Sequence, residues 1–302
     1  MAKIAVEFDA GSGREADRPG RPPSRILAAG EGWSVSEVIC SAGPRDRAFE
    51  EQYSNLCIAI VTEGTFQYRS SAGRELMTPG SLLLGNAGQY FECGHEHGVG
   101  DRCISFAYAP EYFEGLAGEA SVKGRSGRFG ALRVPPVREM SGLVARACAL
   151  HASNGAVAEW EEIGLELAAR ALELASGGAQ NEESFPAAEA RVTRVVRMIE
   201  SCPDLKHSLP SLAREAKLSR YHFLRIFQQL TGLTPHRYIL RARLRRAATR
   251  LLLEPAQVLD VALDSGFGDV SNFNHAFRTE FGTSPRSYRK NSGQTAAQFR
   301  PE

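Results

Sequence analysis

The chain has 302 residues, 43% of them apolar and 24% charged, with 36 Lys or Arg side chains against 35 Asp or Glu. This composition is typical of a globular protein of about two domains, and it excludes a disordered, collagen-like or coiled-coil chain. The net charge of +1 conceals an asymmetry, because residues 188–290 carry 18 basic and 9 acidic side chains while the remainder has an acidic excess. Such a split suggests that the basic segment contacts a polyanion.

The N-terminal residues do not indicate export or membrane insertion. No apolar stretch follows a basic start, and no apolar run approaches the roughly 20 residues that span a bilayer. We therefore expect a cytoplasmic protein without a membrane partner. Its six cysteines are then expected to be thiols or metal ligands rather than disulfides.

Residues 1–30, rich in Gly, Pro, Arg and Asp, are predicted to form a mobile arm. Between Trp33 and Tyr108 the sequence changes to short β-rich runs that are separated by turn residues. The runs are WSVSEVI, LCIAIVT, TFQYRS and SLLLG. Short strands at this spacing are typical of a small barrel or sandwich, and we predict a small β-barrel over residues 31–135.

A cluster of metal-ligating residue types lies late in this region. Cys93, His95, His97 and Cys103 offer imidazole and thiolate groups, which are good ligands for Zn²⁺ and other transition metals. The run is similar to the metal motif of cupins, G-x5-H-x-H-x3-4-E, but has six residues before the first His and Asp101 in place of Glu. We predict a metal site with these four ligands. Two alternatives stay open, namely a polar turn with ordinary buried thiols and reversible thiol oxidation.

Residues 136–176 are predicted to be helical, because apolar residues recur there every three to four positions. The recurring residues are Leu143, Val144, Ala147 and Leu150, followed by Trp160, Ile163, Leu167, Ala171 and Leu174. Residues 177–187 are mostly polar, with a paired Gly and a Pro nearby, and are predicted to be a linker.

The strongest pattern is an internal repeat in the basic segment. The pattern F-x4-G-x2-P-x2-Y occurs twice, at an offset of 50 residues. Its copies are Phe227, Gly232, Pro235 and Tyr238, and then Phe277, Gly282, Pro285 and Tyr288. Each copy fits the second helix of a helix-turn-helix unit, with the glycine ending that helix.

The residues upstream of each copy supply the rest of the unit. In the first, Ser211 is expected to cap a helix over 212–217, and Ser219 a second helix from Arg220 to about Leu230. In the second unit, the turn Gly266-Phe267-Gly268 precedes Asp269, which is expected to cap the second helix. The residues expected to face inward on the helix before that turn are Leu259, Ala262 and Leu263.

A predicted helix from Pro235 to Leu253 joins the two units. Its length of roughly 28 Å is of the order of one turn of B-DNA, about 34 Å, so it could hold two helices in successive major grooves. The helix is rich in arginine, which fits contacts to phosphate but also fits a face that is merely solvated.

These residues resemble the AraC/XylS family of bacterial transcription regulators. The resemblance covers residues 190–290 and is most specific over 266–274 and 281–289. It implies a DNA-binding domain over residues 188–290, followed by a tail over 291–302. It also implies that outward residues of each second helix read bases, namely Arg220, Tyr221, Leu224 and Arg225, and Val270, Ser271, Asn272 and His275.

Chemistry supports some of these assignments more than others. Arg225 can bind guanine O6 and N7 with two hydrogen bonds, and Asn272 can pair with adenine N6 and N7. His275 departs from the arginine that many family members carry there. The candidates for phosphate contact, by charge alone, are Arg243, Arg245, Arg246, Arg278 and Arg286. The alternative for some of them is a structural role.

The resemblance further implies an α+β multidomain chain, with a cupin-like N-terminal domain that senses a small-molecule effector. Residues 136–176 would then form a helical dimerisation element. The partners would be double-stranded DNA, a second copy of the chain and, for an activator, RNA polymerase. The protein is not expected to be an enzyme. The alternative is a cupin-type metal-binding sensor or metalloenzyme tethered to DNA, but no second motif supplies a later His ligand.

Overall fold

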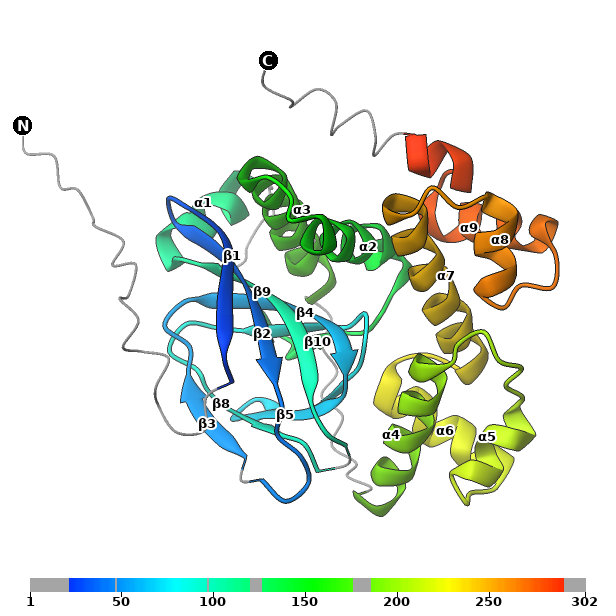
Figure 1. Ribbon diagram of the computed structural model, residues 1–302. Coiled ribbons are helices and arrows are strands. Elements are labelled where there is room, and N and C mark those ends of the chain that lie inside the picture. The colour runs from blue at the N-terminus through cyan, green and yellow to red at the C-terminus, as the bar shows by residue number, and fades with distance from the viewer. Residues whose placement is uncertain (1–21, 47, 97, 120–126, 176–185, 291–302) are drawn as a thin grey trace, which may run out of the picture.

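The computed structural model describes residues 22–46, 48–96, 98–119, 127–175 and 186–290 (Figure 1). Residues 1–21 of the predicted arm, most of the predicted linker and the tail lie outside these residues. In the part that is described, no helix combines the length and the apolar character that a membrane span requires.

The N-terminal domain consists of two antiparallel sheets. One has six strands in the order β1-β2-β9-β4-β7-β10, and the other has four in the order β3-β8-β5-β6. The strands are β1 Ser24–Gly30, β2 Trp33–Cys40, β3 Phe49–Gln52, β4 Leu56–Gly64, β5 Phe66–Ser70, β6 Gly73–Met77, β7 Leu82–Gly85, β8 Tyr90–Gly94, β9 Asp101–Tyr108 and β10 Arg133–Val134. The predicted β-rich domain is confirmed, but the strands of the described residues form two separate sheets and no closed barrel.

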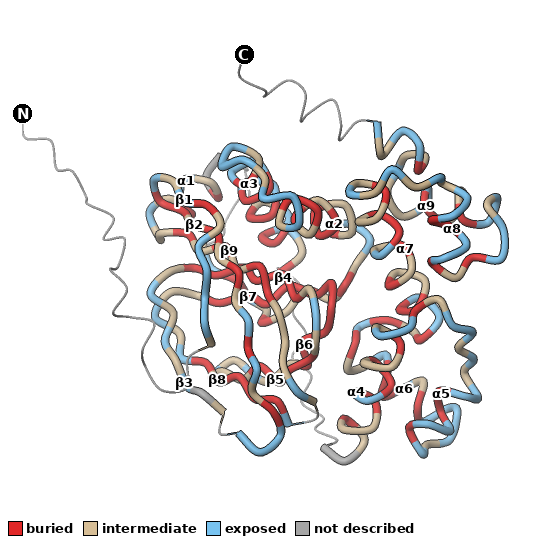
Figure 2. The backbone as a smooth tube through the Cα atoms, in the orientation of Figure 1, coloured by how far each residue is buried: buried red, intermediate tan, exposed pale blue. Residues whose placement is uncertain are grey.

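The alternation of side chains along β4 explains how this domain is layered. Ile58 and Ile60 point to a core that is shared with helices, whereas Ala59 and Val61 point to a second core between the two sheets. Because β4 is covered on both faces, its sequence is almost continuously apolar. Figure 2 shows buried backbone running through these central strands.

Strand β1 was missed by the sequence analysis, which placed residues 24–30 in the arm. It pairs with β2 as an antiparallel edge strand, with Gly30 opposite Trp33. Only Ala28 of this strand is buried, and Ile26 is largely exposed. An edge strand with one buried residue gives little alternation for a pattern search to detect.

Three helices follow or interrupt the sheets. They are α1 Pro110–Glu119, α2 Arg138–Ser153 and α3 Val157–Leu174. Helix α3 lies directly on the six-stranded sheet, where the Tyr108 hydroxyl donates a hydrogen bond of 2.8 Å to the Gly164 carbonyl. The helices predicted over residues 136–176 are confirmed. The apolar stripes of α2 and α3, however, are buried inside the chain, so they no longer support a dimer surface.

The C-terminal domain is all helical. Its helices are α4 Pro186–Ser201, α5 Leu209–Glu215, α6 Arg220–Thr231, α7 Pro235–Leu253, α8 Val258–Asp264 and α9 Val270–Phe281. Helix α7 joins two small cores, because its first half packs with α4, α5 and α6 and its second half with α8 and α9. Figure 1 shows α7 as the strut between the two groups. The predicted linker helix is confirmed, residue for residue.

Two details of these helices differ from the prediction. Helix α5 begins at Leu209 because Ser208 is its N-cap, and Ser211 is the third residue of the resulting capping box. On α8, Leu259 and Leu263 are about half exposed, whereas Val261 and Ala262 are buried. The inward face of this two-turn helix is therefore rotated from the one predicted.

The two domains pack against each other. Ala145 of α2 is buried in the same cluster as Leu244 of α7, and Arg241 of α7 donates a hydrogen bond of 2.7 Å to the Pro136 carbonyl. Lower down, Arg197 of α4 donates to the carbonyls of Val99 and Gly100, both at 3.0 Å. The helices that carry the repeat are thus held against the β-rich domain.

Candidate functional site

Helices α6 and α9 are built in the same way. Ser219 caps α6 by accepting a hydrogen bond from the His222 backbone, and Asp269 caps α9 by accepting one from Asn272 at 2.7 Å. Both helices end at a glycine in the left-handed region, Gly232 at φ 77° and Gly282 at φ 72°. The predicted caps and ends are confirmed.

The repeated aromatic residues are structural. Phe227 meets Tyr238 edge to face with ring centroids 5.6 Å apart, and Phe277 meets Tyr288 in the same way at 5.3 Å. Each pair joins the second helix of a unit to the helix that follows it. The repeat in the sequence therefore reports a packing contact, and the predicted contacts with DNA fall to other side chains.

The predicted base-reading residues lie on the outward faces of α6 and α9. Leu224 and Val270 are half-buried, and the other six are exposed, Tyr221 to 79%. A tyrosine this exposed contributes little to packing within the chain. The geometry places these eight residues together in two groups, but their contacts with bases remain a prediction.

Most of the arginines predicted to contact phosphate have protein partners instead. Arg243 donates to three backbone carbonyls, those of Pro203, Leu205 and Gly266, at 2.7–2.9 Å. One guanidinium nitrogen of Arg245, Nη2, donates to both carboxylate oxygens of Glu200, and Arg246 pairs with Asp204 at 3.0 Å. Of the five candidates, Arg278 and Arg286 are exposed, and their side chains form no ion pair with the described residues. Part of the positive charge of this segment therefore serves the fold.

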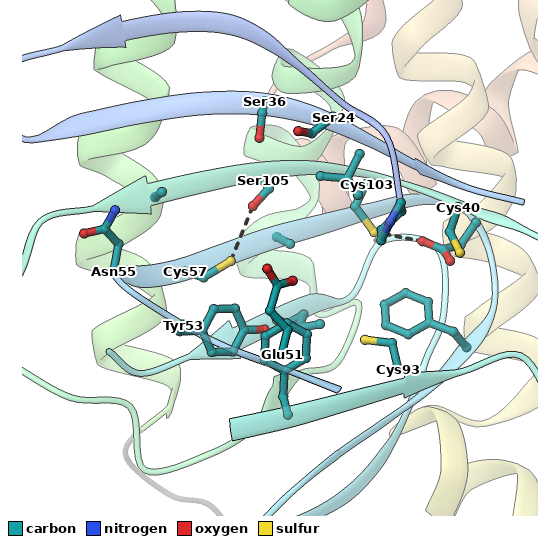
Figure 3. A pocket seen from close by; sticks show the side chains of 18 of the residues that line it. Ser24, Ser36, Cys40, Glu51, Tyr53, Asn55, Cys57, Cys93, Cys103 and Ser105 are labelled. Atoms are coloured by element: carbon teal, nitrogen blue, oxygen red, sulfur yellow. Dashed lines mark hydrogen bonds between the residues drawn. The ribbon is translucent and has the colours of Figure 1, made fainter. Parts of the chain in front are cut away.

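A cavity of about 250 Å³ opens between the two sheets of the N-terminal domain. Figure 3 shows Asn55 at one end of it and Cys40 at the other, with Ser36, Ser105 and Tyr53 between them. The described residues that line it include two carboxylates, Glu51 and Asp101, and no Lys, Arg or His. Such a lining suits a neutral or cationic molecule better than an anion.

Three of the thiols at this cavity are held protonated. Burial raises the pKa of Cys57 to about 11, and it raises the pKa of Cys93 and Cys103 well above the ordinary value. A buried thiol in apolar surroundings is a poor nucleophile and a poor ligand.

Cys40, His95 and Asp101 form a row at the end of the cavity. The Cys40 Sγ atom lies 3.9 Å from His95 Nδ1, and His95 Nε2 lies 2.5 Å from Asp101 Oδ1. The second carboxylate oxygen accepts from the Cys103 thiol at 3.4 Å. Burial alone would lower the pKa of His95, but the hydrogen bonds to Asp101 and Cys40 outweigh it and raise the pKa to about 9.

This row differs from the predicted metal site. Among the described residues, His95 groups with Cys40 and Asp101 within 4.8 Å, while His97 lies outside them. The two ring nitrogens of His95 face different partners, Cys40 on one side and Asp101 on the other. A single ion bound to one of these nitrogens could therefore be bound by both Cys40 and Asp101 only if a side chain moved. A metal bound by Cys93, His95, His97 and Cys103 stays a prediction.

Sequence reasoning missed Cys40 because it lies 55 residues before His95. The pairing of β2 with β9 brings it into place, with Cys40 directly opposite Asp101 in the register. No local spacing signals this contact. Only knowledge of the strand order in the sheet would have predicted that Cys40 lies beside His95.

Comparisons with known proteins find similarity in the C-terminal region. Residues 212–291 match the family described as "Helix-turn-helix domain". The HTH-type transcriptional regulator MtrA of Neisseria gonorrhoeae is 31% identical over 106 residues, which cover 35% of each chain. The HTH-type transcriptional activator RhaS of Klebsiella pneumoniae is 35% identical over 102 residues, 34% of this chain and 37% of that protein.

A solved structure of the DNA-binding domain of AdpA, a global transcriptional factor in complex with a target DNA, is also similar. It is 30% identical, covers 38% of this chain and 99% of that chain, and has a TM-score of 0.34. The chain spans about a third of the length of the curated relatives described above. These relatives are named as transcription regulators, not as enzymes.

Proposed function

We propose that this chain, whose C-terminal domain resembles the AraC/XylS type of helix-turn-helix regulators, is a sequence-specific DNA-binding transcription regulator. One observation carries the proposal. Helices α6 and α9 are capped in the same way, share the same aromatic contact and have outward faces that are mainly polar. They are held at the two ends of one connecting helix, α7. Two helices that read successive major grooves of one DNA duplex require such an arrangement.

Within this proposal each reading helix has one residue with clear base chemistry. Arg225 on α6 can bind guanine through two hydrogen bonds, and Asn272 on α9 can do the same with adenine. The remaining predicted readers, Arg220, Tyr221, Leu224, Val270, Ser271 and His275, add polar and apolar contacts at the groove. Exposed Arg278 and Arg286 supply phosphate contacts.

The N-terminal domain is proposed to sense an effector in the cavity between its two sheets, as a cupin-like sensor would. Two features support the idea, namely the cavity itself and the packing of this domain on α4 and α7. A molecule bound in the cavity would lie close to α4 and α7, the helices that support α6 and α9. Homodimerisation and, for an activator, contact with RNA polymerase stay predictions. A regulator of this kind would act in the cytoplasm.

The proposal is tested by selecting bound sequences from a random pool of duplex DNA with the full-length protein. We expect a single enriched motif. We also expect the logarithm of its binding constant to fall linearly with the logarithm of the salt concentration, as phosphate contacts demand. A pool that stays random after repeated rounds, at salt concentrations where the protein binds DNA, would remove the sequence-reading role.

A further inference from the structure

The cavity between the two sheets has acidic groups in its lining and no basic ones among the described residues. Its two carboxylates are those of Glu51 and Asp101. The other polar groups around it are hydroxyls, amides and thiols, such as those of Ser36, Asn55 and Cys57. A positively charged ligand would therefore meet no like charge from these lining residues.

The two carboxylates differ in what they contact. The Asp101 oxygens are engaged within the protein by His95 Nε2 and by the Cys103 thiol. Figure 3 shows the Glu51 carboxylate directed into the cavity, toward Cys57 on the opposite sheet. Burial raises the pKa of Cys57 to about 11, and the negative charge of Glu51 contributes to that rise. Glu51 is therefore the carboxylate whose charge reaches across the cavity.

Aromatic rings lie next to this carboxylate. Glu51 of β3 pairs with Phe91 of β8, so the two side chains project from the same face of the sheet. Tyr53 follows two residues later and stacks on Phe91, with ring centroids 4.1 Å apart and 19° between the ring planes. All three residues line the cavity. The face of an aromatic ring attracts a cation, and more strongly where water is excluded.

The rest of the lining suits an apolar body. Val38, Phe66 and Leu83 contribute to it from three different strands. The cavity volume of about 250 Å³ exceeds the roughly 150 Å³ that hold a benzene molecule in an engineered protein cavity. One space thus combines a carboxylate, a pair of stacked rings and room for an apolar group.

We propose that the N-terminal cavity binds a small protonated amine with an apolar body. The ammonium group donates hydrogen bonds to the Glu51 carboxylate and contacts the aromatic pair of Tyr53 and Phe91. The apolar body fills the space beyond them. The proposal rests on the proposed function, because it names the class of effector that the N-terminal domain senses.

The same residues discriminate against an anion. A carboxylate ligand would bring a second negative charge next to Glu51, and the described lining residues offer no cationic side chain to balance it. A neutral ligand of the same shape gains the apolar contacts but not the interaction of opposite charges. The charge of the ligand therefore decides its affinity.

The test compares three probes of similar shape with the full-length protein, by isothermal titration calorimetry at neutral pH. The probes are phenethylamine, its neutral analogue phenethyl alcohol and the anion hydrocinnamate. We expect phenethylamine to bind at least about tenfold more tightly than the alcohol, because hydrogen bonds to charged groups are the stronger ones. Hydrocinnamate should bind more weakly than the alcohol.

Two variants assign the preference to one carboxylate. Glu51→Gln should lower the affinity for phenethylamine to that for the alcohol and leave the affinity for the alcohol unchanged. The matched control is Glu50→Gln, because Glu50 is the exposed neighbour on β3 and projects from the opposite face. The control should keep the preference of the wild type for the amine.

Two results would overturn the proposal. One is that the wild-type protein binds the amine no more tightly than the alcohol, a comparison that does not depend on whether a variant folds. The other is that Glu51→Gln keeps the preference for the amine, which would place the positive charge elsewhere.

Sequence selection from random DNA, carried out on the same preparations, separates this proposal from the proposed function. A protein that selects one DNA motif but does not prefer the amine would contradict the ligand class alone. A protein that prefers the amine but selects no DNA motif would contradict the proposed function and support the assignment of the cavity.

Discussion

At the scale of single residues, α6 and α9 separate the residues that pack from the residues that are proposed to read bases. The residues that repeat in the sequence, such as Phe227 and Phe277, are fully buried and hold each unit together. The residues that differ between the units, such as Arg225 and Asn272, face outward. A sequence repeat was enough to predict the first group, whereas the second followed from helical periodicity and the family resemblance.

Arginines show the limit of prediction from charge alone. Charge alone put Arg243, Arg245 and Arg246 among the phosphate contacts, yet each is engaged by carbonyls or carboxylates of its own chain. The partners, including Glu200 and Asp204, lie about 40 residues away in sequence. No pattern of local spacing could reveal such pairs.

Arg225→Ala tests base reading by α6. We expect the variant to lose about 1–3 kcal/mol of binding free energy at the selected site and much less on random DNA, because a bidentate contact with one base is removed. The measurement is a fluorescence anisotropy titration with both DNAs. The control, Arg170→Ala, removes an exposed arginine of α3 and should change neither value. An equal loss on both DNAs would make Arg225 a phosphate contact.

At the scale of elements, caps and registers decide where the site residues lie. The strands, the helices α6 and α7 and both glycine ends were predictable, because alternation, helical period and cap residues are local signals. The edge strand β1 and the inward face of α8 were not. Too few of their residues are buried for periodicity to show. The row of Cys40, His95 and Asp101 depends on the pairing of β2 with β9, which is a long-range property.

Asp269→Ala tests the start of α9. The Asp269 carboxylate accepts the Asn272 backbone hydrogen at 2.7 Å, so its removal should cost about 0.5–2 kcal/mol of unfolding free energy. The quantity is measured by urea denaturation, beside Asp260→Ala on the first turn of α8 as the control. A variant as stable as the control would show that the cap is not needed in the folded chain.

Glu37 on β2 connects the elements around the six-stranded sheet. Its carboxylate lies 3.1 Å from Arg25 of β1, 3.6 Å from Arg102 of β9 and 2.9 Å from His151 of α2. Burial alone would raise the pKa of Glu37, but Arg25, His151 and Arg102 outweigh it and lower the pKa below its ordinary value of 4.5. The ionised form is therefore the stabilising one.

Glu37→Gln should make the protein less stable at pH 7. A carboxyl whose pKa is lowered by folding contributes stability that is present above about pH 4.5 and is lost as the pH falls through the folded pKa. The difference in unfolding free energy between wild type and variant should therefore shrink below pH 4.5. A difference that stays constant from pH 7 to pH 4 would mean that the charge is not what stabilises this junction.

At the scale of the whole molecule, the two domains form one packed body with polar contacts at the interface. Arg197 donates to Thr65, Val99 and Gly100 across that interface, and Arg74 of β6 pairs with Glu189 of α4 at 3.2 Å. The order of the domains was predictable from the composition and from the spacing of apolar residues along the chain. Their packing was not, because it depends on single side chains far apart in sequence.

Arg197→Ala tests the connection between the domains. We expect faster hydrogen–deuterium exchange at residues 98–101, because two backbone carbonyls there lose their donor. Arg194→Ala removes an exposed arginine of the same helix and is the matched control. Unchanged exchange at residues 98–101 in Arg197→Ala would show that this contact does not hold the segment.

The most direct test of DNA reading by two helices is a pair of sequence selections with Arg225→Ala and Asn272→Ala. We predict that the wild-type motif contains two blocks about one helical turn apart, each read by one helix in its own major groove. Arg225→Ala should then lose preference in one block only, and Asn272→Ala in the other only. If both variants relaxed the same block, or neither relaxed any position, the account of two reading helices on one strut would be wrong.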